Sequence, residues 1–270
     1  MFDGGAVSPR SRAQCLPECD RHPHSRPVIV LFTDFGLAGP YTGQLLAVLQ
    51  RDAPGVAAIP LFADAPAGQP KPSAYLLAAY AAWFPPGSVF LCVVDPGVGG
   101  ERRSVVAEAS GKYFVGPDNG LFDLVLRRGE AAALWEIVWR PALLSASFHG
   151  RDLFAPVAAR LARGDKLTEL AQPADDRAAE RGWPDDLAEI VYLDHYGNSL
   201  TGLRGTLVPA QARLRASHRS IAPAATFSAV PPGEAFWYVN SNGLAEIAVN
   251  GGSAGAVLGL RVGSAVTIEN

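Results

Sequence analysis

Short apolar runs and helical patterns alternate along the first 170 residues of the chain. The continuous apolar runs at 28–32 and 89–94 are typical of strands that are buried on both faces. Apolar residues at helical spacing predict helices at 41–49 and 73–83, and Ser73 is suited to cap the second one. Strands that alternate with helices indicate a largely parallel sheet with polar residues at the strand ends. The same patterns predict strands at 56–61, 105–109 and 113–115, and helices at 121–127 and 152–161.

The pattern changes in the last third of the chain. Pro, Asp, Arg and Glu dominate residues 171–186, which we interpret as a linker between two domains. Beyond it, short alternating stretches separated by Gly, Asn, Pro and Ser predict a small β-barrel or sandwich. The sequence therefore predicts a Rossmann-like α/β domain at 27–170 and a smaller C-terminal β-barrel domain at 187–270. Strands of the second domain are expected at 189–193, 235–239, 244–249 and 265–268.

The composition is that of an ordinary globular protein. Apolar residues make up 49% of the chain and charged residues 18%, a balance that argues against disorder. A formal net charge of -3 and the lack of a basic stripe argue against a nucleic-acid partner. No apolar run approaches the roughly 20 residues that a membrane-spanning helix needs. We therefore expect neither nucleic-acid binding nor membrane insertion.

Residues 1–26 lack the apolar stretch of a signal peptide or membrane anchor, and we predict a disordered N-terminal tail there. Cys15 and Cys19 lie in this tail, and two histidines follow them. A zinc clip is conceivable, but the spacing is loose and no second pair closes a site. Cys92 lies in an apolar run and is expected to be a buried small hydrophobe. Three cysteines without a disulfide framework fit a reducing cytoplasm.

Acidic residues stand at the ends of three predicted strands, namely Asp34, Asp95 and Asp118. Ligands of open α/β sheets bind outside the carboxyl ends of the strands, so three such residues favour a shared ligand site. Each one alone could equally cap a helix or hold a turn, as the Asp-Asn-Gly sequence at Asp118 indicates. Glycines after Asp95 let the backbone approach a ligand closely, and Arg102 supplies a cation. His149 could complete an Asp, Arg and His set.

Other kinds of site agree less well with the sequence. The segments at 34–36 and 149–152 superficially resemble the DFG and HRD motifs of protein kinases, but their order is reversed and the glycine-rich loop is missing. A dinucleotide-binding fingerprint and a P-loop are missing too. Arg102 would neutralise a nearby carboxylate rather than help it recruit a metal, and no HxH, HxxxH or DxD spacing is present, so we expect no metal. The alternative, a metal-dependent hydrolase, would use Asp34, Asp95, Asp118, His149 and Asp152 as ligands.

Seven short motifs occur in order along residues 27–270. Together they resemble the S-adenosyl-L-methionine (SAM) hydroxide adenosyltransferase family, also called SAM hydrolases, which are relatives of the fluorinase and chlorinase. The motifs are TDFG at 33–36, FPPG at 84–87, VDPGVG at 94–99, PDNGL at 117–121, FHGRD at 148–152, DHYGN at 194–198 and AVNGGSA at 248–254.

The resemblance implies an α/β domain and a barrel that assemble as a homotrimer, with each active site between the α/β domain of one protomer and the barrel of the next. It implies hydrolysis of SAM to adenosine and L-methionine, with SAM as the substrate and no cofactor. The family's catalytic set falls on Asp95, Arg102 and His149, and we interpret His149 as the acceptor of a proton from water that attacks C5′. The substrate-binding residues are then Asp34, Asp118, Asn119, Asp194, Tyr196, Asn198, Ser241, Glu246, Val249 and Asn250.

The branch of the family decides which nucleophile is expected. The fluorinase has Tyr in place of Asp95 and Tyr-Ser in place of His149 and Gly150. A carboxylate at Asp95 would repel a halide, so the hydrolytic branch is favoured. Two alternatives stay open, a chlorinase-like halide adenosyltransferase and a non-catalytic protein that binds adenosine or SAM. The second is motivated by departures from the family pattern at Gly39 and Phe62.

Overall fold

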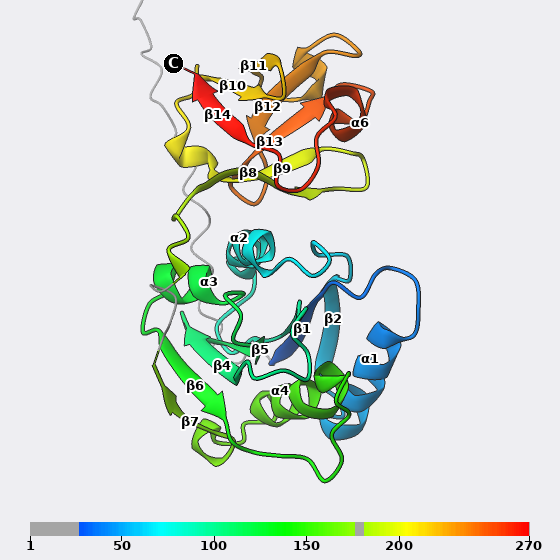
Figure 1. Cartoon of the computed structure of the whole chain (residues 1–270), viewed down its shortest axis with the longest axis vertical. Helices are drawn as coiled ribbons and strands as arrows, with labels where there is room; N and C mark the ends of the chain where they lie inside the picture. The colour runs from blue at the N-terminus through cyan, green and yellow to red at the C-terminus, as the bar shows by residue number, and fades with distance from the viewer. Residues whose placement is uncertain (1–26, 176–180, 270) are drawn as a thin grey trace, which may run out of the picture.

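The structure is a computed structural model that describes residues 27–175 and 181–269. The predictions for the N-terminal tail, disorder and a zinc clip at Cys15 and Cys19, concern a segment outside the described residues. Two seven-stranded sheets form two units that follow one another along the chain (Figure 1). The described part of the chain has no helix long and apolar enough to cross a membrane.

The first sheet has the strand order β2-β1-β3-β5-β4-β6-β7, and its first four strands pair in parallel. The predicted α/β class is confirmed, although β4, β6 and β7 pair antiparallel. For β4 the reason is the tight turn at Ser110 and Gly111, which both have positive φ and join β4 to β5 as a hairpin. The strands are β1 (Val28–Thr33), β2 (Ala57–Phe62), β3 (Val89–Val93), β4 (Ser104–Ala109), β5 (Lys112–Pro117), β6 (Ala133–Ile137) and β7 (Ala171–Ala174).

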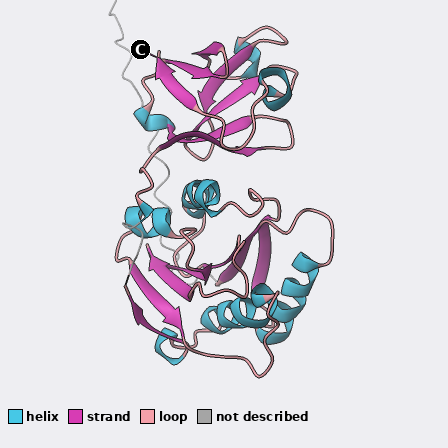
Figure 2. Cartoon of the chain, in the orientation of Figure 1, coloured by secondary structure: helices cyan, strands magenta, loops and turns pink. Residues whose placement is uncertain are grey.

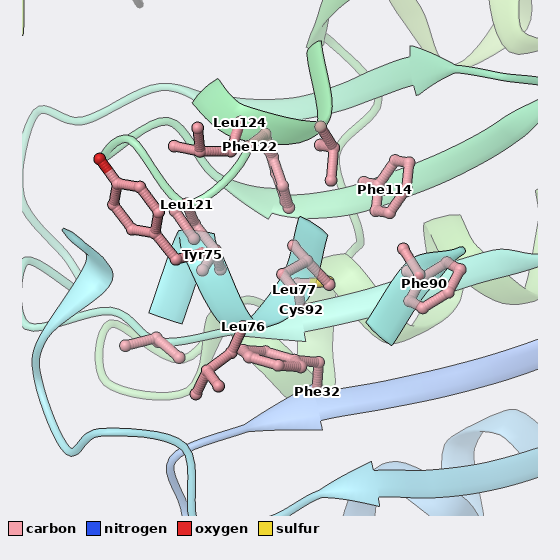
Figure 3. Close-up of a cluster of buried hydrophobic side chains, with 14 of the residues drawn as sticks. Phe32, Tyr75, Leu76, Leu77, Phe90, Cys92, Phe114, Leu121, Phe122 and Leu124 are labelled. Atoms are coloured by element: carbon pink, nitrogen blue, oxygen red, sulfur yellow. The ribbon is translucent and has the colours of Figure 1, made fainter. Parts of the chain in front are cut away.

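Helices cover both faces of the first sheet, and alternate residues of β1 enter different cores. Ile29 and Leu31 pack with α1 and α4. Val30 and Phe32 pack with α2 and α3 on the other face. Figure 3 shows this second core, in which Cys92 is buried as predicted. The helices are α1 (Tyr41–Asp52), α2 (Pro70–Ala81), α3 (Asp123–Arg128) and α4 (Ala155–Ala162).

Three predicted helix starts differ from the structure, and α3 begins at Asp123 rather than at residue 121. Helix α2 begins at Pro70, because the fixed φ of proline suits the first turn of a helix. Ser73 therefore lies inside the helix, where its hydroxyl donates to the carbonyl of Gln69 at 2.8 Å instead of capping. The helix expected at 152–161 starts earlier, as the π-helical turn Gly150–Phe154 that continues into α4.

The second unit is built almost entirely of strands (Figure 2). Its sheet has the order β14-β10-β11-β12-β13-β9-β8, and an antiparallel bridge between Glu189 and Ala265 brings its two ends together. The backbone of Ile190 donates to Ser264 and accepts from Gly263, both at 2.8 Å, so the sheet is nearly closed and the predicted barrel is confirmed. The elements are β8 (Leu187–Leu193), β9 (Ser199–Arg204), β10 (Arg213–Ala216), β11 (Arg219–Pro223), β12 (Ala235–Val239), β13 (Leu244–Val249), α6 (Ala254–Leu258) and β14 (Val266–Glu269).

Side chains from α2 and from the loop after β2 connect the first unit to the barrel. Lys71 of α2 forms an ion pair with Glu189 of β8 at 3.0 Å. The hydroxyl of Tyr192 in β8 donates to Asp64 at 2.8 Å. The segment 171–186 begins with β7 in the first sheet, and the boundary between the two domains remains a prediction.

Candidate active site

Asp95 and Arg102 form a nearly buried ion pair at the carboxyl end of the first sheet. Asp95 lies two residues beyond β3, and Arg102 lies two residues before β4. The Nε of Arg102 donates to the two carboxylate oxygens at 3.1 and 3.0 Å, and its Nη2 also donates to Oδ2. Only 3% of the Asp95 side chain and 12% of the Arg102 side chain are exposed. The pair therefore has one fixed orientation at the edge of the sheet.

The turn between these two residues explains why His149 joins them. Gly99 has φ +80 and lies against the loop that carries the histidine. A Cβ on Gly99 would be only 2.5 Å from the carbonyl oxygen of Ala146, so a residue with a side chain would push the two loops apart. Gly150, which follows His149, is also closely packed, against the rings of Phe35 and Phe148.

His149 is hydrogen-bonded to Arg102, with 3.0 Å between Nη2 and Nδ1. A guanidinium can only donate, so Nδ1 accepts, and the proton of the neutral ring lies on Nε2. Burial, with a contribution from the charge of Arg102, lowers the pKa of His149 below its ordinary value. The imidazole is thus held in the neutral form, and the ring nitrogen that could accept a proton already faces a cation.

Two further contacts fix the guanidinium of Arg102. Its Nη1 donates to the hydroxyl of Ser104 at 3.0 Å, and Ser104 is itself only 9% exposed. The guanidinium carbon lies 5.4 Å from the centre of the Phe154 ring, within the range of a cation–π contact. Arg102 therefore has a carboxylate, an imidazole, a hydroxyl and an aromatic ring around it.

Asp34 lies beside this set, directly after β1. Its backbone N–H donates to the carbonyl of Val93 at 3.3 Å, and its Oδ2 accepts from the backbone N–H of Gly68 at 2.8 Å. Burial raises the pKa of the Asp34 carboxyl, and the negative charge of Asp95 contributes in the same direction. The structure thus brings together four of the predicted site residues, namely Asp34, Asp95, Arg102 and His149.

Asp118 and Asn119 have partners within the protein. The carboxylate of Asp118 accepts from Arg103 at 2.7 Å and from Arg181 at 2.9 Å. Asn119 donates to the carbonyl of Val94 at 2.8 Å, next to Asp95, and accepts from a backbone N–H of the following turn. We interpret Asp118 as a structural anion and Asn119 as a brace for the end of β3, rather than as groups that contact a sugar.

Six of the predicted barrel residues line one pocket of about 780 Å³. Tyr196 is 77% exposed at this pocket, so it is not a barrel-core residue. Asn250 is not among the lining residues, and its side chain donates to the carbonyl of Val230 at 2.8 Å. Sequence reasoning missed Tyr80 of α2, and no local signal could have placed it beside the barrel. The six residues are Asp194, Tyr196, Asn198, Ser241, Glu246 and Val249.

Two carboxylates organise the polar side of this pocket. Asp194 accepts from the backbone N–H groups of Tyr196 and Asn198 at 2.9 and 2.8 Å and so holds its own loop. Glu246 is 4% exposed and accepts from the Tyr238 hydroxyl at 2.6 Å and from the Asn240 amide at 2.8 Å. Burial raises the pKa of Glu246.

The site residues therefore form two groups within one chain. We call Asp95, Arg102 and His149, which the sequence predicts to be catalytic, the catalytic set, and Asp34 lies beside it. We call the pocket described above the barrel pocket. No hydrogen bond or ion pair among the described residues joins the catalytic set to the residues that line the barrel pocket. Within residues 27–175 and 181–269, no group of three or more His, Cys, Asp or Glu is placed to hold a metal ion.

Comparison with known proteins identifies family models and relatives that match this chain. The family models for the SAM hydroxide adenosyltransferase N-terminal and C-terminal domains match residues 29–171 and 188–267. Proteins named (R)-S-adenosyl-L-methionine hydrolase from Salinispora arenicola and Thermus thermophilus are 38% and 39% identical. Each alignment covers 90% of this chain, and 98% and 99% of the relatives.

Two solved structures share the fold. The crystal structure of a conserved protein from Thermotoga maritima is 31% identical, with a TM-score of 0.81 over 90% of this chain and 100% of that chain. The crystal structure of a conserved protein from Thermus thermophilus is 33% identical, with a TM-score of 0.73 over 90% of this chain and 99% of that chain.

Proposed function

The chain belongs to the SAM hydroxide adenosyltransferase family, and we propose that it hydrolyses SAM to adenosine and L-methionine. Two of the relatives compared above are named for the (R) epimer of SAM, and we propose the same epimer as the preferred substrate. The observation that carries the proposal is the direct contact of Arg102 with both Asp95 and His149, beside Asp34.

The proposed reaction is a displacement at C5′. The oxygen of water forms a bond to C5′, and the C5′–S bond breaks with its electron pair going to sulfur. Methionine leaves as a neutral thioether, so the leaving group needs no acid, and one proton passes from water to solvent. Activation of the weak nucleophile is therefore the main task of the protein.

The catalytic set supports a division of this task. The Asp95 carboxylate accepts a hydrogen bond from the water and relays its proton, since Arg102 holds both oxygens in place. The Arg102 guanidinium stabilises the negative charge that develops on the water oxygen. His149 acts as a neutral group that donates through Nε2–H, a revision of its expected role as proton acceptor, because its Nδ1 faces Arg102.

Substrate binding divides between the two groups of residues. Asp34 would accept hydrogen bonds from the ribose hydroxyls beside the catalytic set. Tyr196 and the other residues of the barrel pocket would hold the remainder of the substrate, with the exposed ring available for stacking. We propose that a homotrimer completes each site from the catalytic set of one protomer and the barrel pocket of the next.

Hydrolysis in water enriched in oxygen-18 tests the proposal. Attack at C5′ places the label in the 5′ hydroxyl of adenosine and none in methionine, which mass spectrometry of the separated products detects. Chloride buffer is the matching condition for the halide alternative, where 5′-chloro-5′-deoxyadenosine without adenosine would reject hydrolysis. Calorimetric binding of SAM without products over many hours would favour the non-catalytic alternative. Separated sulfonium epimers, assayed side by side, test the stereochemical preference.

A further inference from the structure

The two groups of site residues carry far more negative than positive charge. Asp34 and Asp95 supply two carboxylates, and the single cation of the catalytic set, Arg102, is already paired with Asp95. The barrel pocket adds Asp194 and Glu246. Among the described residues that line this pocket there is no Lys, Arg or His. The site as a whole therefore favours a cationic ligand.

The negative charge of Asp194 acts on Glu246 within the barrel pocket. The negative charge of Asp194 adds to the effect of burial in raising the pKa of Glu246. An anionic group of a ligand would meet the same repulsion in the pocket, because Glu246 is nearly buried and poorly screened by solvent. His195 lies on the same loop as Asp194, but it is exposed, packs against the Tyr196 ring and does not line the pocket.

SAM carries one anionic group, the α-carboxylate, next to a cationic ammonium and a cationic sulfonium. The pocket offers this carboxylate only neutral donors, such as the side chains of Asn242 and Ser241. The amide of Asn240 is already used, since its nitrogen donates to Glu246 and its oxygen accepts from two backbone N–H groups. The α-carboxylate thus gains little in this site, whereas the two cationic groups gain much.

We propose that the enzyme recognises the positive charge of a sulfonium nucleoside and does not require the α-carboxylate. Decarboxylated SAM, which carries an aminopropyl tail and one more net positive charge, is then also a substrate. Water forms the bond to C5′, the C5′–S bond breaks with its electron pair going to sulfur, and one proton passes to solvent. The products are adenosine and 3-(methylthio)propylamine. This inference rests on the hydrolase activity proposed above.

Steady-state kinetics with the two substrates, each as the same mixture of sulfonium epimers, tests the inference. We expect the kcat/KM of decarboxylated SAM to lie within about tenfold of that of SAM or above it, because only neutral hydrogen bonds are lost. A deficit larger than about tenfold, the size expected when a charged partner is lost, would overturn the inference and leave the hydrolase activity intact.

A charge variant locates the effect in the barrel pocket. Asn242→Arg adds the missing cation, and we expect it to shift the kcat/KM ratio toward SAM by about tenfold. Gln172→Arg makes the same change of charge on an exposed position of β7, outside both groups of site residues, and should leave the ratio unchanged. An Asn242→Arg enzyme that folds with the wild-type melting temperature and the wild-type ratio would contradict the proposal.

Calorimetry separates the two possible failures. Binding of SAM and of decarboxylated SAM to the wild-type protein reports the charge preference even if no product forms. Binding of the decarboxylated compound that equals or exceeds that of SAM, without products from either, supports the charge preference and rejects the hydrolase. Clearly tighter binding of SAM rejects the charge preference, whatever the kinetics show.

Discussion

Arg102 and Arg103 are neighbours in the sequence, yet they enter two ionic clusters of different character. Arg102 pairs with Asp95 and faces the neutral ring of His149. Arg103 pairs with Asp118, which also accepts from Arg181. Successive side chains of an extended segment point to opposite sides, so adjacent arginines reach different partners.

The two clusters differ in what they leave for a ligand. The cluster around Asp118 closes on itself, because Arg181 also donates to Asp123 at 2.9 Å and Arg103 to a backbone carbonyl. The catalytic set instead includes a titratable ring whose Nε2–H has no hydrogen-bond partner among the described residues. An aspartate at a strand end is therefore a candidate for catalysis when its arginine is shared with a neutral group, and a structural residue when arginines surround it.

Replacing the arginine of each cluster should give the largest contrast. Arg102→Met removes the cation that stabilises the developing hydroxide, and we expect kcat of the folded enzyme to fall by about 10³-fold. The melting temperature should fall as well, because the nearly buried Asp95 carboxylate loses its partner. Arg103→Met should lower the melting temperature while the folded enzyme keeps its kcat. Steady-state rates and thermal unfolding of both variants check this pair. Equal losses of kcat would contradict the division into catalytic and structural clusters.

Asp118→Asn should lower the stability of the fold, whereas a change in the catalytic set should lower kcat. The side chain is 10% exposed and faces two arginines, so loss of its charge leaves Arg103 without a carboxylate partner and Arg181 with Asp123 alone. We expect the free energy of unfolding to fall by about 3 kcal/mol, as for other broken buried ion pairs. Urea denaturation measures this value. Asp185→Asn, in an exposed pair with Arg127, is the control and should cost less than about 1 kcal/mol.

Parts of the catalytic set could be predicted because strand ends are visible in the sequence. An apolar run that stops at an aspartate placed Asp34 and Asp95 on the same edge of the sheet, and the structure agrees. The contact of Asp118 with a second arginine could not be predicted, since Arg181 lies 63 residues away in the chain. The neutral tautomer of His149 depends on a contact with Arg102 across 47 residues, which no local pattern contains.

The barrel shows a similar limit. Its strands β8, β12, β13 and β14 follow from alternating polarity, but β9, β10 and β11 were not predicted. Strand β9 contains Gly202, where a Cβ would be 2.6 Å from the Cβ of Leu187, so close packing against β8 requires a residue that weakens the strand signal. Tyr80 reaches the barrel pocket from α2, and only the packing of the two units places it there.

The pH dependence of catalysis tests the neutral imidazole. Because the pKa of His149 is lowered below its ordinary value of about 6.5, the ring is neutral at pH 7 and gains a proton only at lower pH. Protonated His149 would face the Arg102 guanidinium, so we expect kcat to fall in acid with a midpoint below about 6.5. The stability of the fold should also decrease in acid. The contribution of the neutral His149 ring to stability is present above about pH 6.5 and is lost as pH falls through the lowered pKa.

His149→Gln separates this group from Asp34, which also titrates in acid with a raised pKa. Glutamine can accept from Arg102 but does not titrate, so we expect roughly tenfold lower kcat and loss of the acid step that belongs to the imidazole. Rate profiles between pH 4.5 and 8 check both. An acid step that is unchanged in the variant would remove His149 from the mechanism.

Ser104→Ala should produce the smallest effect and gives the finest test of how the catalytic set is positioned. The serine hydroxyl accepts from Arg102, so its loss removes one of several partners that orient the guanidinium. We expect kcat to fall by about threefold while KM is unchanged, since a single hydrogen bond contributes about 0.5–1.5 kcal/mol. Ser88→Ala is the matched control, because Ser88 is also buried and hydrogen-bonded but precedes β3 at the opposite end from Asp95. A control that loses as much kcat as Ser104→Ala would show that removal of any buried serine hydroxyl near the sheet has this effect, and that the orientation of Arg102 is not its cause.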